Sequence, residues 1–189
     1  MPGGEGAAVG PRADVPGLYA RLLGEAWAAL PEPIRRLHQL DDRLVATGRA
    51  RVERGGGLAS RLIGALTGLP PAAEDVAVRV EFRRRGEREI WRRDFGGRTL
   101  VTPQGPGRDG LLVERFGPVS FEMTPAWDGQ RLGLTLRRWR LFGLSMPAAL
   151  GPRMTAWEAV VEGRFAFFVE MGHPAVGLLV RYRGWLTPV

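Results

Sequence analysis

The segment from Arg164 to Leu186 constrains the fold of this chain more than any other. Two runs rich in Phe, Val, Leu, Tyr and Trp flank the connection Gly-His-Pro-Ala-Val-Gly at residues 172–177. Such runs, separated by a short loop that contains glycine and proline, are typical of two neighbouring antiparallel strands. We therefore expect a closing hairpin here, and a larger antiparallel sheet that this hairpin completes.

Several earlier segments have the two-residue period of a β-strand. Val76, Val78 and Val80 alternate with Ala77, Arg79 and Glu81, and Asp128-Gly129 has the composition of a tight turn between two such runs. Residues 103–110 are rich in glycine and proline and are predicted to form a loop. The predicted strands are 44–54, 76–83, 88–95, 99–102, 111–116, 119–127, 131–142, 153–161, 164–172 and a last one ending near residue 186.

Two or three helices are expected before most of these strands. Leucines and Trp27 at spacings of three and four predict a helix over residues 16–30, which Pro31 ends, and a short helical turn follows over residues 34–40. Strands that follow helices in runs disfavour a parallel α/β fold. We expect an α+β protein, mainly antiparallel β, with about eight to ten strands in a curved sheet, barrel or half-barrel of the calycin kind.

A further helix is predicted over residues 58–69, and its only charged residue is Arg61. A short helix with a broad apolar face is expected to lie on other apolar surface. It could plug the concave side of the sheet, form a mobile lid over an apolar ligand site, or lie on a membrane surface. The residues assigned to a lid are Leu58, Leu62, Ile63 and Leu66.

The length and composition indicate one domain. The chain has 189 residues, of which 44% are hydrophobic, which suffices for one substantial core over residues 16–189. Residues 1–15 are rich in Gly, Ala and Pro and are predicted to be a disordered lead rather than a signal peptide. No stretch has the roughly 18 apolar residues of a membrane span, and we expect a cytoplasmic protein.

The charge of the chain invites a nucleic-acid interpretation, which the arrangement of charges disfavours. The net charge is +7, and all 27 basic residues are arginines. Acidic residues are interleaved with them, whereas a nucleic-acid binder segregates a basic stripe and adds exposed aromatic residues. The absence of cysteine excludes disulfides, thiolate metal sites and a cysteine nucleophile. His38 lies near Asp41 and Asp42 without a third strong ligand, so we expect no metal and no cofactor.

Candidates for chemistry lie mainly in the strands. His173, at the end of a strand, and Glu170 are the candidate acid and base. Strand glutamates and arginines either point inward, where they could orient an anionic or carbonyl ligand, or form pairs on a solvent face, the arrangement we favour. Aromatic residues and methionines are either core or ligand cage. The residues assigned to ligand binding are Trp91, Phe121, Met123, Trp139, Trp157, Phe167, Arg181, Tyr182 and Arg183.

Three segments carry a resemblance to a known family. They are LYARLLGEAWAALPEPIRRLH from Leu18, GRARVERGGGLASRLIGALTGLPPAAEDVAVRVEF from Gly48, and GLLVRYRGWL from Gly177. Together they resemble a bacterial family catalogued as domain of unknown function 4166 (DUF4166). Its members stand alone or are fused to modules that include nucleotide-binding oxidoreductase domains of the saccharopine-dehydrogenase type. The resemblance implies a role beside an enzyme, and it assigns no catalytic residues.

Three functional hypotheses follow from these patterns. The first is a barrel that binds a hydrophobic small molecule, such as a lipid or polyketide-like compound, as an accessory to an oxidoreductase. The second is a cofactor-independent cyclase or isomerase, in which His173 or a strand glutamate moves a proton. The third is a structural partner domain of an oxidoreductase, which predicts an exposed apolar patch rather than an internal cavity.

Overall fold

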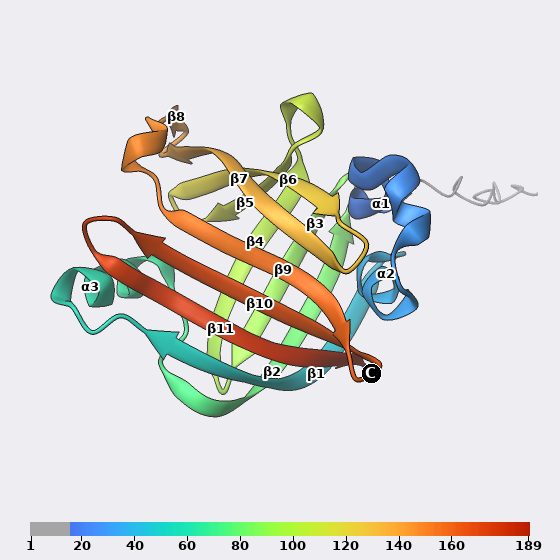
Figure 1. The fold of residues 1–189 in the computed structure, drawn as a ribbon, viewed down its shortest axis with the longest axis horizontal. Coiled ribbons are helices and arrows are strands. Elements are labelled where there is room, and N and C mark those ends of the chain that lie inside the picture. Colours follow the sequence, from blue (N-terminus) through green and yellow to red (C-terminus); the bar gives the residue numbers. More distant parts are fainter. Residues whose placement is uncertain (1–15) are drawn as a thin grey trace, which may run out of the picture.

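The computed structural model describes residues 16–189, so the predicted lead lies outside the described part of the chain. Ten antiparallel strands form a closed barrel with a few helices at its ends (Figure 1), which confirms the predicted calycin-like α+β fold. The strands of the ring are β1 (Arg43–Arg54), β2 (Ala73–Arg85), β3 (Arg88–Phe95), β4 (Arg98–Pro106), β5 (Leu112–Phe116), β6 (Val119–Trp127), β7 (Arg131–Leu141), β9 (Arg153–Val161), β10 (Arg164–His173) and β11 (Gly177–Pro188).

Sequential pairing builds most of the ring, and one long-range pairing closes it. Strands β1 to β7 each pair with the next, β9 pairs with both β7 and β10, and β11 lies between β10 and β1. The predicted hairpin of β10 and β11 is present, with Phe165 opposite Leu186. The two-residue strand β8 (Leu144–Ser145) pairs only with β7, outside the ring. The short helices η2 (Arg108–Gly110) and η3 (Ala148–Leu150) lie in connections.

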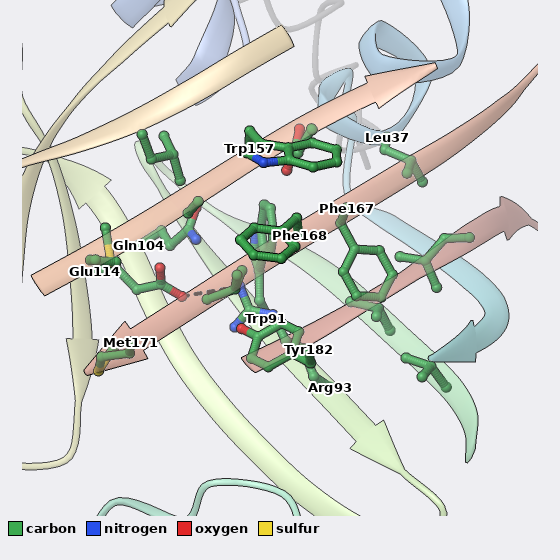
Figure 2. A pocket seen from close by; sticks show the side chains of 18 of the residues that line it. Leu37, Trp91, Arg93, Gln104, Glu114, Trp157, Phe167, Phe168, Met171 and Tyr182 are labelled. Carbon is green, nitrogen blue, oxygen red and sulfur yellow. Dashed lines mark hydrogen bonds and ion pairs between the residues drawn. The ribbon is translucent and has the colours of Figure 1, made fainter. Parts of the chain in front are cut away.

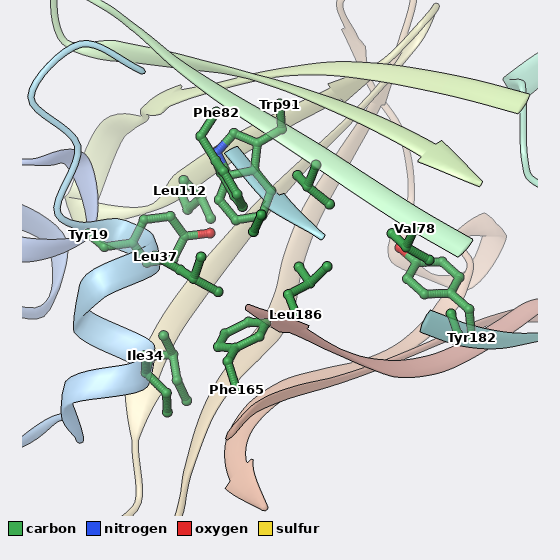
Figure 3. Packing of buried hydrophobic residues seen from close by; sticks show 14 of the residues in the cluster. Tyr19, Ile34, Leu37, Val78, Phe82, Trp91, Leu112, Phe165, Tyr182 and Leu186 are labelled. Carbon is green, nitrogen blue, oxygen red and sulfur yellow. The ribbon is translucent and has the colours of Figure 1, made fainter. Parts of the chain in front are cut away.

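The N-terminal helices lie at one end of the barrel (Figure 1). They are α1 (Leu18–Leu23), the 3₁₀ helix η1 (Gly24–Ala29) and α2 (Glu32–His38). The prediction of one continuous helix over residues 16–30 is wrong, because the backbone at Gly24 has φ of 55° and ψ of −127°, a conformation that interrupts an α-helix. Tyr19, Ile34 and Leu37 pack from these helices onto the barrel core (Figure 3).

The predicted loop over residues 103–110 is partly wrong, because β4 continues to Pro106. Pro103 lies opposite Ile90 of β3, and the pairing of β4 with β5 begins only at Gln104. Proline has no N–H group, so a strand tolerates it at a position where the backbone does not need to donate a hydrogen bond to a neighbouring strand. The glycine and proline content therefore concealed four residues of strand, 103–106, that contribute to the barrel wall.

Helix α3 (Leu58–Thr67) lies at the opposite end of the barrel from α1 and α2 (Figure 1). Its buried residues are Ser60 and Gly64, whereas Leu58, Leu62 and Leu66 are 83%, 62% and 73% exposed. The alternative in which these leucines plug the sheet is therefore wrong, and among the four residues assigned to a lid only Ile63 packs against the core. Among residues 16–189, no helix is long and apolar enough to cross a membrane.

Candidate functional site

The interior of the barrel contains a cavity of about 90 Å³ (Figure 2). It lies inside the ring of strands, where the alternation of each strand directs every second side chain inward. Most of the lining is aromatic or aliphatic, including Phe167, Met123, Met154 and Met171. A few polar side chains face the same space, and they fall into two groups.

The first polar group lies on neighbouring strands β3, β4 and β5. Arg93 donates hydrogen bonds to Thr102 Oγ1 at 2.5 Å and to Glu114 Oε1 at 3.0 Å, and Thr102 donates to the same carboxylate oxygen at 2.7 Å. The guanidinium also lies 4.6 Å from the centre of the Trp91 ring. Burial alone would lower the pKa of Arg93. The charge of Glu114, the nearby Tyr182 and the hydrogen bond to Glu114 together outweigh burial, and the pKa is raised.

Tyr182 of β11 faces this group from another part of the wall. Burial raises the pKa of its hydroxyl to about 12, although the charge of Arg93 opposes the increase. The phenol therefore stays protonated at neutral pH and can donate a hydrogen bond. Within residues 16–189 its hydroxyl has no hydrogen-bond partner. The Tyr182 side chain lines the cavity.

The second polar group joins helix α2 to strand β9. His38 Nε2 lies 2.6 Å from Glu158 Oε2, and the His38 side chain is fully buried while that of Glu158 is 12% exposed. Burial lowers the pKa of His38, but the charge and the hydrogen bond of Glu158 more than offset this, so the pKa is raised. The Tyr19 ring lies over the imidazole with centroids 3.8 Å apart.

Tyr19 connects the two groups. Its hydroxyl donates to Gln104 Oε1 at 3.1 Å, and Gln104 lies directly opposite Glu114 in the β4–β5 pair. Burial, followed by the charge of Glu158, holds the pKa of Tyr19 well above its usual value. In the described chain, His38 Nδ1 is buried without a hydrogen-bond partner. A single hydrogen bond thus joins helix α1 to β4, and a ring contact joins Tyr19 to His38.

Five of the residues predicted to bind a ligand line this cavity. They are Trp91, Met123, Trp157, Phe167 and Tyr182. Trp157 also stacks on Phe168 with centroids 5.4 Å apart. Phe167 shares the inward phase of β10 with Phe165, Val169 and Met171, whereas Trp157 lies in the phase of β9 opposite to that of Met154 and Glu158. The signal that predicted these five residues is the aromatic or thioether character of their side chains.

The other predicted site residues lie elsewhere. Phe121 is buried in the core, and the Trp139 indole donates to the carbonyl of Pro147. Arg181 pairs with Glu170 and with Glu53 on the outer face of the sheet, and Arg183 lines a shallow outer groove beside Trp185. His173 accepts a hydrogen bond from the N–H of Ala175 in the turn after β10. The structure brings neither His173 nor Glu170 to the cavity, and their catalytic roles stay predictions.

The sequence interpretation missed the second polar group, which joins helix α2 to strand β9. His38 was assigned to a helix end beside Asp41 and Asp42, but its carboxylate partner is Glu158, which is 120 residues away in sequence. Only the inward phase of Met154, Ala156 and Glu158 could have indicated that this glutamate faces the interior. No group of three or more His, Cys, Asp or Glu side chains that could hold a metal ion occurs in the described residues.

A family comparison covers nearly all of this barrel. The model of a family described as a domain of unknown function, DUF4166, matches residues 30–186, from the end of η1 to the last core residue of β11. No curated protein is detectably similar to the chain. Since the match extends over most of the chain and includes every strand of the ring, the protein belongs to the DUF4166 family.

Proposed function

We propose that this protein binds a small hydrophobic molecule, lipid or polyketide-like in character, inside the barrel. The observation that supports the proposal best is the internal cavity, which has an apolar lining and a few convergent polar groups. Most small-molecule sites in proteins have this composition. The filled interior that would argue against the proposal is absent from the described part of the barrel.

The volume of the cavity limits what enters without rearrangement. About 90 Å³ is less than the roughly 150 Å³ of an engineered protein cavity that binds benzene. A larger ligand therefore requires that lining side chains move. Met123, Met154 and Met171 are suited to this, because the unbranched thioether side chain adopts alternative rotamers at low cost.

The proposal is tested by native mass spectrometry of the protein purified from its own host, followed by organic extraction. We expect a stoichiometric apolar compound. Ala156→Leu, which fills part of the cavity with a larger side chain, should abolish retention of the compound, whereas Ala166→Leu in the outward phase of β10 should not. A wild-type protein that is empty, and that also binds no apolar probe in solution, would contradict the proposal.

A cofactor-independent cyclase or isomerase is a second candidate, supported by the His38–Glu158 pair at the cavity. A buried imidazole that shares a proton with a carboxylate is suited to proton transfer in an apolar pocket. If the retained compound is converted by the wild type, Glu158→Gln should remove turnover while the ligand still binds. Equal turnover in the variant would contradict this role.

An accessory role beside an oxidoreductase is supported by a different observation, the exposed leucines of α3. Exposed apolar stripes of this kind often mark protein contacts. The triple substitution Leu58→Ser, Leu62→Ser and Leu66→Ser should then weaken binding to a co-expressed oxidoreductase domain of the saccharopine-dehydrogenase type. Ligand retention should be unchanged. Unchanged binding of that domain would exclude this surface.

A further inference from the structure

The cavity presents hydrogen-bond donors at one place. The Tyr182 hydroxyl, which stays protonated, has no partner in the described chain. Arg93 uses two of its five N–H groups, one toward Thr102 and one toward Glu114, and it also faces the cavity. Figure 2 shows Arg93 and Tyr182 at the same part of the pocket. A ligand oxygen that accepts hydrogen bonds would therefore be stabilised there.

A hydrogen-bond acceptor lies in another part of the cavity. Glu158 uses Oε2 for His38, and its Oε1 has no hydrogen-bond partner among residues 16–189. The side chain lines the cavity and is partly accessible within it. An ionised carboxylate has lone pairs in excess of this single bond, so a ligand hydroxyl or N–H group would find an acceptor here.

The charges of the lining argue against an anionic ligand. Arg93 is already neutralised by Glu114 at 3.0 Å, and His38 faces Glu158. A ligand carboxylate would add an unbalanced negative charge to an apolar interior, which is costly. A neutral carbonyl makes the same hydrogen bonds to Tyr182 and Arg93 without that cost.

We infer that the ligand is a neutral hydroxy-carbonyl compound, with its carbonyl oxygen at Tyr182 and Arg93 and its hydroxyl group at Glu158. The apolar body between the two ends contacts Met123, Phe167 and Met171. This inference rests on the proposed function and narrows it to one chemical class. Fatty acids and other carboxylates are excluded as preferred ligands.

The test uses five-carbon ring probes that suit a small cavity: cyclopentane, cyclopentanol, cyclopentanone, 3-hydroxycyclopentanone and cyclopentanecarboxylate. Binding to the full chain is followed by the methyl resonances of Met123, Met154 and Met171, which line the cavity. We expect 3-hydroxycyclopentanone to bind at least tenfold more tightly than cyclopentane, and cyclopentanecarboxylate to bind most weakly.

Two variants that each remove one hydroxyl group separate the proposed contact from general effects on the fold. Tyr182→Phe removes a hydroxyl that has no protein partner, so it should weaken the ketones about fivefold, as for one hydrogen bond, and leave cyclopentane and cyclopentanol unchanged. Thr124→Val is the control, because the Thr124 hydroxyl accepts a hydrogen bond from Arg137 and lies outside the cavity. It should not change the preference for a ketone. Glu158→Gln should reduce the advantage of the hydroxyl group while the ketone advantage persists.

The outcomes distinguish failure of this inference from failure of the proposed function, the binding of a hydrophobic small molecule. If cyclopentane binds as tightly as 3-hydroxycyclopentanone, or if the carboxylate binds best, the inference is wrong and the barrel is an apolar binder of another class. Unchanged ketone affinity in Tyr182→Phe would likewise overturn the assigned contact. If none of the probes binds and the protein from its host is also empty, the inference and the proposed function both fail.

Discussion

His38 and Glu158 link the stability of the fold to pH. The pKa of His38 is raised in the folded protein above its ordinary value near 6.5. Below that value the imidazole is protonated in both the folded and the unfolded states, so the pair contributes its full stabilisation. As the pH rises through the folded pKa, the folded protein loses the proton and with it this contribution.

We therefore expect the free energy of unfolding to fall as the pH rises from about 6 through the raised pKa of His38. Urea denaturation at a series of pH values measures the slope. Glu158→Gln should flatten it, because the variant removes the charge that favours the imidazolium. His173→Gln, in the β10–β11 turn, serves as the control and should keep the wild-type slope. A wild-type slope in Glu158→Gln would contradict the assignment.

Gly184 is required by the close packing of β11 against β1. A Cβ atom at this position would lie 2.1 Å from the Arg49 carbonyl oxygen and 2.9 Å from the Phe167 ring. Gly184→Ala should therefore cost about 1–3 kcal/mol of unfolding free energy, as measured by thermal or urea denaturation. Gly133→Ala is the matched control, because the nearest atom to its Cβ would be 3.9 Å away. Equal stability of the two variants would show that the wall accommodates the methyl group.

At the scale of elements, Arg54 at the end of β1 makes most of the hydrogen bonds that attach α3 to the barrel. The Arg54 guanidinium donates to the carbonyl oxygens of Ser60, Leu69 and Pro70, at 3.1 to 3.4 Å, and Ser60 Oγ donates to the carbonyl of Leu178 at 3.0 Å. Burial lowers the pKa of Arg54. The helix is thus attached through its polar and small residues, which explains why its leucines face outward.

Arg54→Ala should detach α3 without opening the barrel. Amide hydrogen exchange in residues 58–67 is expected to accelerate at least tenfold, while exchange in β1 and β11 away from residue 54 stays slow. Arg61→Ala, an exposed position on the same helix, is the control and should leave both rates unchanged. Unaltered exchange in Arg54→Ala would indicate that other contacts suffice to hold the helix.

The strands could be predicted from sequence, whereas the orientation of α3 and the polar site could not. The alternation of apolar residues, such as Val76, Val78 and Val80, is visible in the sequence because one face of each strand is buried. The apolar pattern of α3 shows that its faces differ, but it does not show which face meets the barrel. The His38–Glu158 contact depends on how α2 meets β9, and no local pattern encodes that distance.

At the scale of the whole molecule, the pairing of β1 with β11 determines how the barrel forms. Residues as distant in sequence as Ala46 and Pro188 lie opposite each other in this pair. Contacts between such distant segments require the closure of a long loop before they are stabilised. We expect refolding in milliseconds to seconds, followed by tryptophan fluorescence in stopped-flow dilution from urea. A microsecond main phase would contradict the expectation that this pairing limits the rate.

The position of β11 between β10 and β1 has a consequence for biosynthesis. During translation, the first nine strands of the ring emerge from the ribosome before the strand that joins their two edges. The edges of β1 and β10 stay unpaired until residue 188 has left the exit tunnel, and unpaired edges are templates for aggregation. The nascent chain must therefore be protected at both edges for as long as its last strand is still inside the ribosome.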